Sequence, residues 1–105
     1  MTLITLSVII FLMIKTFADQ ETEKLFGRTF SRKLSQNVQL AARMKLEILD
    51  AAEVLQDLHV PPGNRLEKLS GNREGQYSIS INDQWRICFV WQQENAYDVE
   101  IVDYH

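Results

Sequence analysis

The chain has 105 residues, 46% hydrophobic and 24% charged, which allows one domain with a single core. Its net charge of −3 at pH 7 argues against a protein that holds nucleic acid by bulk charge alone. The lone cysteine, Cys88, excludes an internal disulfide, fits a reducing cytosol and predicts a buried structural thiol. The sequence offers no His or Cys cluster, so we expect no metal site and no cofactor.

Residues 1–12 form an almost uncharged apolar stretch, shorter than the roughly 20 residues of a membrane-spanning helix. The stretch also lacks the basic start and small-residue cleavage site of a secretory signal. It is either a short membrane anchor or the product of a start assigned too early, with Met13 as the true first residue. The break in composition at Met13 favours the second interpretation. We therefore expect an apolar extension over 1–12, one domain over 13–105 and no membrane association.

The first half of the domain predicts a strand and two helices. Residues 13–17 are compatible with a strand, and Asp19 is placed to cap a short helix that ends at Gly27. Ser35 is placed to cap a longer helix from about residue 36 to 55. The expected core positions of that helix are Val38, Ala41, Ala42, Met44, Ile48, Leu49, Ala52 and Leu55. Its expected solvent positions are Gln39, Arg43, Glu47, Asp50 and Glu53.

The second half predicts an antiparallel sheet. Two prolines make 59–64 a connector, and Gly71 and Gly75 mark a turn over 70–75. The expected strands cover 65–69, 76–81, 85–92 and 97–101, with turns at Asn82-Asp83 and Gln93-Glu94-Asn95. Helices followed by hairpin-linked strands are typical of an α+β domain, in which the helices cover one face of the sheet.

Polar side chains with catalytic potential gather in this second half. They are Arg65, Lys68, Arg73, Arg86, Asp103, Tyr104 and His105. No Gly-rich phosphate loop and no metal-ligand spacing accompanies them. The set fits RNA cleavage without a metal, which needs a base for the 2′-hydroxyl proton, cations for the phosphorane and an acid for the leaving 5′-oxygen.

Each of these positions also has a structural interpretation. Arg86 lies on the strand face away from Trp85 and Trp91, where it either contacts a phosphate in an exposed groove or pairs with an acid such as Glu100. The terminal residues 103–105 either complete a site or form a frayed polar end. The residues alone leave both questions open.

Several segments form one pattern: Met13-Ile14-Lys15-Thr16-Phe17 as a start, 65–78, Asn82-Asp83-Gln84-Trp85-Arg86-Ile87, 96–100 and Asp103-Tyr104-His105. Through these segments the chain resembles, over 13–105, the HigB toxins of the RelE/ParE superfamily. The resemblance implies a RelE-like fold and a cytoplasmic endoribonuclease that cuts mRNA in the ribosomal A site. It also implies neutralisation by a HigA-type helix-turn-helix antitoxin, through which alone the toxin would reach DNA.

The resemblance also implies roles for single residues. Arg86 corresponds to the arginine that holds the scissile phosphate, and Asp103, Tyr104 and His105 correspond to the terminal triplet implicated in cleavage. Arg65, Lys68 and Arg73 are expected to contact RNA, although Lys68 and Arg73 match the basic positions of the family only loosely.

Two residues depart from the family pattern. Glu67 stands where some members have a histidine, and Ser70 stands where a lysine usually precedes the turn glycine. A missing charge-assisted phosphate contact costs about 1.5–3 kcal/mol, so we expect a slow toxin, with Lys68 substituting in part.

Three functions are compatible with this pattern. The first is a ribosome-dependent mRNA interferase. The second is a weakened or inactive toxin-fold protein that acts as an antitoxin partner and co-repressor. The third, gyrase inhibition as in ParE relatives, requires no proton-transfer groups, so the Asp-Tyr-His terminus argues against it.

Overall fold

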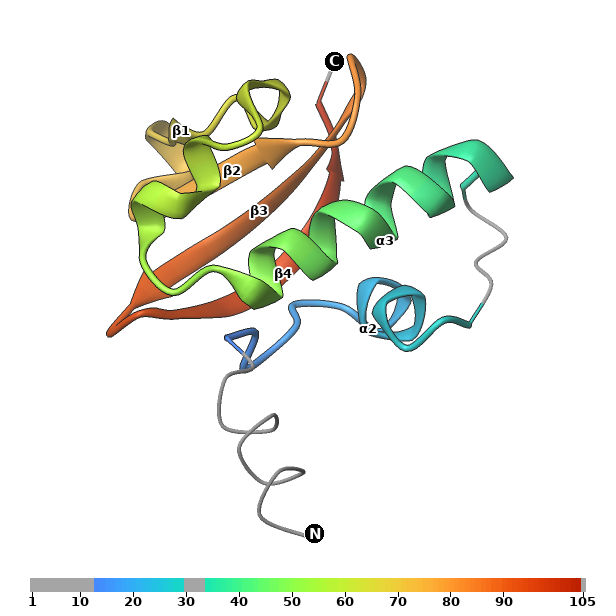
Figure 1. Cartoon of the computed structure of the whole chain (residues 1–105), viewed down its shortest axis with the longest axis horizontal. Coiled ribbons are helices and arrows are strands. Elements are labelled where there is room, and N and C mark those ends of the chain that lie inside the picture. The colour runs from blue at the N-terminus through green and yellow to red at the C-terminus, as the bar shows by residue number, and fades with distance from the viewer. Residues whose placement is uncertain (1–12, 30–33, 105) are drawn as a thin grey trace, which may run out of the picture.

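The computed structural model describes residues 13–29 and 34–104, in which two α-helices pack against a four-stranded antiparallel sheet (Figure 1). The strands are β1 (Glu67–Lys68), β2 (Gln76–Ser80), β3 (Trp85–Gln92) and β4 (Asn95–Asp103), in the spatial order β1-β2-β3-β4. Every neighbouring pair is antiparallel. The expected α+β class is confirmed. The apolar extension and start assignment expected for 1–12 lie outside the described residues.

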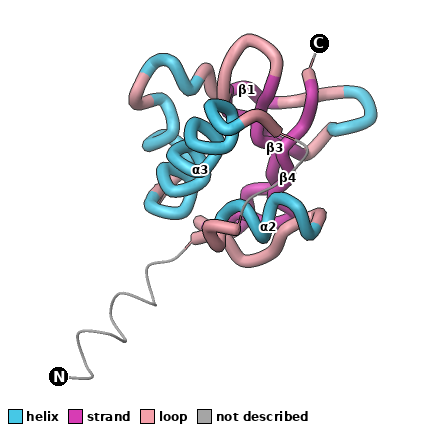
Figure 2. Tube along the Cα trace, turned by 90° about the vertical axis from the view of Figure 1, so that its right-hand side faces the viewer, coloured by secondary structure: helices cyan, strands magenta, loops and turns pink. Residues whose placement is uncertain are grey.

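The two helices begin where the sequence predicted. Asp19 accepts a hydrogen bond from the Thr22 amide and caps α2 (Gln20–Phe26), which ends at Gly27. The Ser35 hydroxyl accepts from the Val38 amide and caps α3 (Gln36–Ala51). In Figure 2, α3 lies along one side of the sheet, and α2 packs near β4.

The second helix ends at Ala51, four residues earlier than expected. A carboxylate oxygen of Asp57 accepts from the Glu53 and Val54 amides, and these local bonds start a separate 3₁₀ helix, η1 (Leu55–His59). A second 3₁₀ helix, η2 (Pro62–Asn64), follows in the connector.

The buried face of α3 is rotated relative to the expected one. Met44, predicted to be core, is 60% exposed, whereas Leu46 is fully buried. Gln39 and Asp50 are buried rather than solvent-facing, because their side chains satisfy main-chain groups. Gln39 donates to the Leu34 carbonyl. Asp50 accepts from the amides of residues 13 and 14 and so fixes the start of the described chain to the helix.

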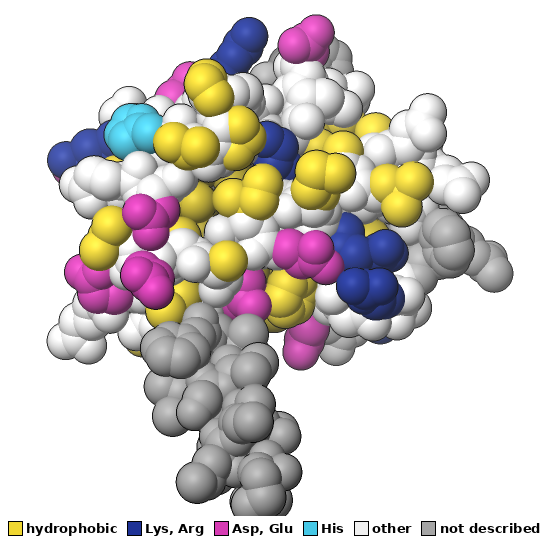
Figure 3. Space-filling model, in the orientation of Figure 1, with side chains coloured by type: hydrophobic (Ala, Val, Ile, Leu, Met, Phe, Trp, Pro, Cys, Tyr) yellow, Lys and Arg dark blue, Asp and Glu magenta, His cyan; other side chains and the backbone are white. Residues whose placement is uncertain are grey.

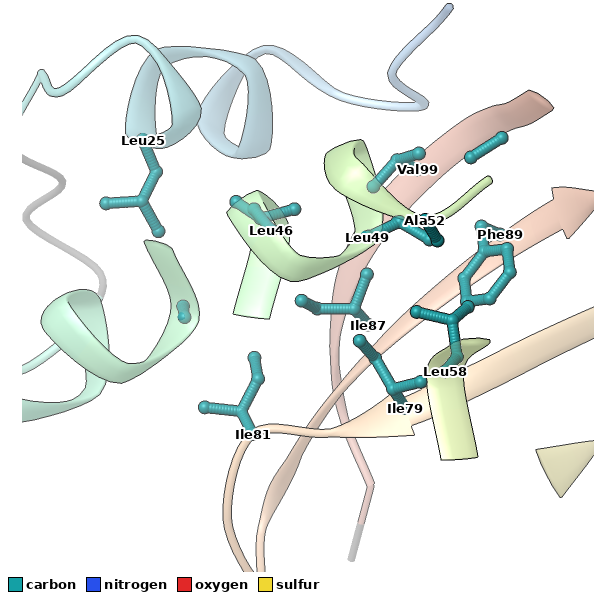
Figure 4. Packing of buried hydrophobic residues seen from close by; sticks show 12 residues of the cluster. Leu25, Leu46, Leu49, Ala52, Leu58, Ile79, Ile81, Ile87, Phe89 and Val99 are labelled. Atoms are coloured by element: carbon teal, nitrogen blue, oxygen red, sulfur yellow. The ribbon is translucent and has the colours of Figure 1, made fainter. Parts of the chain in front are cut away.

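The core lies between α3 and the sheet (Figure 4). Leu46 and Leu49 from α3 meet Ile87 and Phe89 from β3. Further buried side chains come from α2, η1, β2, the residue after β2 and β4: Leu25, Leu58, Ile79, Ile81, Ala96 and Val99. Burying a Leu, Ile, Val or Phe side chain stabilises the fold by about 1.5–3 kcal/mol, so this layer fixes how β3 is oriented.

The segment expected as a first strand makes only two isolated bridges, both parallel to β4. These bridges join Ile14 to Ala96 and Phe17 to Val99. Between them β4 bulges: Asp98 has a φ of 53°, and the β3–β4 register shifts between Cys88 and Val90. The Asp98 amide donates to the Thr16 hydroxyl instead of to a strand partner. The bulge therefore prevents a continuous ladder.

The β2–β3 turn forms at Asn82 and Asp83, as the sequence predicted. Neither residue has a positive φ; the Asn82 side chain stabilises the turn by accepting from the amides of Gln84 and Trp85. The β3–β4 turn, at Gln93 and Glu94, does use positive φ at both residues. The strand expected over 65–69 is reduced to the two residues of β1.

Over residues 13–29 and 34–104, no helix has both the length and the apolar character needed to cross a membrane.

Candidate active site around Arg86

The alternation of β3 gives the sheet two chemically different faces. Ile87 and Phe89 point to α3, so the residues between them, Arg86 and Cys88, point to the other side. Antiparallel pairing places Ser78 and Glu100 directly opposite Cys88 on the two neighbouring strands. We call this side, defined by Ser78, Arg86, Cys88 and Glu100, the polar face.

Arg86 is 8% exposed, which corrects the expectation of an exposed groove at this position. Its Nε donates to the Ser78 hydroxyl at 2.7 Å, and its Nη2 donates to the carbonyl oxygens of Arg65 at 2.6 Å and Ser78 at 3.3 Å. A buried guanidinium needs such acceptors, because desolvating a charged group is costly. Among the described residues, the carboxylate that pairs with Arg86 is that of Glu67, at 3.9 Å from Nη2, and not that of Glu100.

The Arg65 carbonyl reaches Arg86 because of an unusual backbone conformation. Arg65 follows η2 and has φ 47° and ψ 56°, in the left-handed region that residues with a Cβ rarely adopt. Its side chain is exposed. Arg65 therefore contributes a main-chain acceptor to the site as well as an exposed cation.

The structure brings Tyr104 to Arg86. The Arg86 Cζ lies 5.7 Å from the centroid of the Tyr104 ring, a distance typical of a cation–π contact. The Tyr104 amide donates to the Gln84 carbonyl, which ties the end of β4 to the β2–β3 turn. His105 lies outside the described residues.

Asp103, unlike Tyr104, does not lie beside Arg86. It is the register partner of Trp85, so strand alternation places its side chain on the opposite side of the sheet from Arg86. Its carboxylate accepts from the Gln84 side chain at 3.2 Å. Of the two described residues of the terminal triplet, Tyr104 thus lies beside the Arg86 guanidinium and Asp103 does not.

Arg73 lies on the polar face and is paired. Its Nη1 donates to Gln76 at 3.0 Å and to Glu100 at 3.3 Å. Cys88 lies beside this pair, fully buried. Burial raises the pKa of the Cys88 thiol; Arg73 opposes that rise, Glu100 adds to it and Arg86 opposes it.

Lys68 lies on the other side of the sheet. It pairs with Tyr77, whose ring stacks on the core residue Phe89, so both face the α3 side. Here a pocket of about 210 Å³ is lined by Leu55, Gln56, His59, Leu66, Lys68 and Tyr77. Figure 3 views this side, where apolar side chains lie across α3 and charged ones gather around them. Lys68 is therefore not placed to replace a cation beside Arg86.

Glu67 is the residue that the sequence pattern did not assign to the site. It pairs with Ser78 across β1 and β2, and its half-exposed carboxylate approaches Arg86 on the polar face. Strand register is the signal that could have found Glu67. Pairing of Glu67 with Ser78, and of Ser78 with Cys88, places these three residues on one face of the sheet.

The geometry defines an α+β protein with a buried arginine, a tyrosine and a carboxylate on one face of its sheet. The fold is RelE-like: the solved structure titled "YoeB-YefM complex from Staphylococcus aureus" matches with a TM-score of 0.57 and 21% identity, covering 90% of this chain and 97% of that one. Residues 15–105 match the model of the HigB-like toxins, described as the RelE-like toxin of the type II toxin-antitoxin system HigB. The chain belongs to this family.

Two of the three curated relatives described next are named HigB. Toxin HigB-1 of Vibrio cholerae is 48% identical over 60 residues, which are 57% of this chain and 63% of that protein. An uncharacterized protein of Haemophilus influenzae is 36% identical over 70 residues, 67% of this chain and 66% of that one. Endoribonuclease HigB of Proteus vulgaris is 29% identical over 93 residues, 89% of this chain and all of that protein. The chain thus spans slightly less than two thirds of the first two relatives.

The buried thiol of Cys88 yields a prediction about reactivity and pH. Native protein should react with a thiol reagent about tenfold or more slowly than protein unfolded in urea, because Cys88 is buried and its pKa is raised. The unfolded chain then ionises first as pH rises past the ordinary value of 9.0, so the free energy of unfolding should fall there. In Cys88→Ala this alkaline contribution should vanish. Equal labelling rates in native and unfolded protein would contradict the burial.

Proposed function

We propose that this protein is a ribosome-dependent endoribonuclease that cleaves translated mRNA in the cytoplasm, with the polar face as its active site. The observation that carries the proposal is the guanidinium of Arg86, held by three hydrogen bonds with the Tyr104 ring beside it. A fixed guanidinium suits the charge that develops on a phosphorane, because it needs no reorganisation during the reaction.

One edge of the guanidinium is free for this task. The hydrogen bonds of Arg86 use Nε and Nη2, and no described residue accepts from Nη1. We assign Nη1 to a non-bridging oxygen of the scissile phosphate. The exposed side chain of Arg65, and Arg73 once released from Glu100, supply further positive charge for the RNA backbone.

The proposed reaction moves two protons and needs no metal. The 2′-hydroxyl oxygen attacks the neighbouring phosphorus while a base takes its proton, and the bond from phosphorus to the 5′-oxygen breaks as an acid protonates that oxygen. The products are a 2′,3′-cyclic phosphate and a free 5′-hydroxyl. Among the described residues, no group of three or more His, Cys, Asp or Glu side chains could hold a metal ion.

We assign the base to Glu67, whose half-exposed carboxylate pairs with Arg86 on the polar face. Tyr104 is positioned to act with His105 on the leaving group, with the phenol beside the guanidinium. Asp103 would act through the turn that it contacts by way of Gln84, since its own side chain is on the far side of the sheet.

The proposed function involves two partners. We propose that the toxin acts on mRNA in the ribosomal A site and is neutralised by a HigA-type helix-turn-helix antitoxin, through which alone it approaches DNA. Membership of a toxin–antitoxin family supports an antitoxin partner.

Replacement of Arg86 tests the proposal directly. In a purified translation system, Arg86→Lys should slow mRNA cleavage by about 100-fold, because an ammonium cannot donate to the same acceptors and at the same time reach the phosphate. Removal of His105 should also abolish growth arrest. The matched control is Lys24→Ala, a cation on the exposed surface of α2. Binding of the co-expressed antitoxin verifies that the variant is folded. Cleavage at the parental rate by Arg86→Lys would contradict the assignment of Arg86.

The assignment of Glu67 is tested by an uncharged side chain of the same shape. Glu67→Gln removes the base, so cleavage should slow by about 10²–10⁴-fold. Glu74→Gln, on an exposed turn, is the control. A Glu67→Gln variant that cleaves at the parental rate would remove Glu67 from the mechanism.

A second candidate function is that of a catalytically weak antitoxin partner and co-repressor. The observation that favours it is that both polar-face arginines are paired with carboxylates, Arg86 with Glu67 and Arg73 with Glu100. A phosphate must compete with these acids, and Ser70 supplies no compensating charge.

Ser70→Lys distinguishes the two functions. Adding a cation at this exposed position should raise cleavage by about 10- to 100-fold if the protein is a weakened nuclease. If the protein acts only by binding, cleavage should stay undetectable while antitoxin binding is unchanged. Ser70→Gln is the control for side-chain size.

A further inference from the structure

We infer that Ser78 and the main-chain carbonyl of Arg65 are positioning groups that fix the Arg86 guanidinium in the orientation needed to bind phosphate. The inference rests on the proposed function of Arg86 and adds two groups to it. Neither group needs to touch RNA in this role; both act through Arg86. We call these two groups, together with the Ser78 carbonyl, the arginine clamp.

Ser78 is suited to this task by its place in the sheet. It is fully buried in β2, between its register partners Glu67 on β1 and Cys88 on β3. Its hydroxyl accepts from Arg86 Nε and its carbonyl accepts from Nη2. Because β2 is hydrogen-bonded on both sides, these two acceptors cannot move independently of the sheet.

The second part of the clamp is built from a strained backbone. Arg65 adopts the left-handed conformation that directs its carbonyl to Nη2 at 2.6 Å. The segment is anchored by the fully buried Asn64, whose amide donates to the carbonyls of Leu58 and Val60 and whose oxygen accepts from Lys45. Strain of this kind persists only where its surroundings enforce it, and it is common at functional sites.

Together the acceptors restrict the guanidinium to one orientation. Bonds to Nε and Nη2 hold one edge of the planar group, the Tyr104 ring lies near it, and Nη1 remains as the donor for an incoming phosphate. An arginine side chain otherwise samples many rotamers. Loss of the arginine clamp should therefore reduce the cleavage rate at saturation more than it reduces affinity for mRNA. The positive charge of Arg86 would remain, but the guanidinium would no longer be held in one orientation.

The first test substitutes Ser78. Under single-turnover conditions with ribosome-bound mRNA, Ser78→Ala should lower the saturating cleavage rate by about 10- to 100-fold, while the half-saturating toxin concentration changes less than about threefold. Ser78→Thr, which keeps the hydroxyl on a residue suited to a strand, should restore most of the rate. Equal rates for Ser78→Ala and the parent would overturn the inference.

The second test separates the Arg65 carbonyl from the Arg65 side chain. Arg65→Gly and Arg65→Val both lack the guanidinium, but only glycine adopts the left-handed backbone without strain. Both variants should need a higher half-saturating concentration, because a cation is lost. Only Arg65→Val should also lose saturating rate, because its carbonyl is displaced. Equal saturating rates for the two variants would show that the carbonyl has no positioning role.

A third measurement keeps this inference separate from the nuclease proposal. In ¹⁵N-labelled protein, hydrogen exchange at Arg86 Nε should be slowed by its buried bond to Ser78, and Ser78→Ala should remove that protection. If the parent protein never cleaves mRNA but shows protected exchange, the proposed function fails and the clamp stands. If exchange is equally fast in both proteins, the clamp fails even when cleavage is observed.

Discussion

The burial of one guanidinium is the constraint on which the polar face depends. Arg86 is almost removed from solvent, and a buried charge is tolerated only when hydrogen-bonded acceptors replace water. Those acceptors come from β2 and from the residue that follows η2, so the segment before β1 must fold back onto the sheet. The connector over 59–64, which the sequence marks only as a break, thereby positions Arg65, which contributes to the proposed site. Removing the arginine or displacing its acceptors would leave polar groups unsatisfied.

A single strand serves both the core and the site. In β3, Ile87 and Phe89 pack beneath α3, and this packing obliges Arg86 and Cys88 to point the other way. The hydrophobic effect thus sets the side of the sheet on which the proposed site lies. A shift of β3 by one residue would turn Arg86 toward the apolar core and Ile87 away from it. The position of the proposed site therefore depends on that register.

The sequence alone predicted features that depend on local chemistry. The caps at Asp19 and Ser35, the α+β class and the alternation of β3 follow from side chains close in sequence. Features that depend on distant partners were missed. Met44 is exposed because packing against the sheet selects a slightly different stripe of α3, and the strand expected at 13–17 is interrupted by the bulge at Asp98.

The same limit applies to the site. Sequence resemblance grouped Asp103 with Tyr104, but only a known β3–β4 register shows that they point to opposite sides. It treated Glu67 as a departure from a pattern, whereas strand pairing brings its carboxylate near Arg86. Lys68 was grouped with the RNA-binding cations, yet its pairing with Tyr77 sets it on the α3 side. Turns and bulges decide which residues pair across neighbouring strands, and the sequence pattern of a single strand does not reveal that pairing.

In the proposed function, the scissile phosphate meets the polar face at Arg86. The most direct measurement is a cryo-electron microscopy structure of the protein on a ribosome whose A-site mRNA carries 2′-O-methyl groups that block attack. We expect Nη1 of Arg86 to lie about 3 Å from a phosphate oxygen, with Glu67 facing the blocked 2′-oxygen and the arginine clamp unchanged. An mRNA bound along the α3 side near Lys68, or a protein bound to the ribosome with its polar face away from the mRNA, would contradict the account.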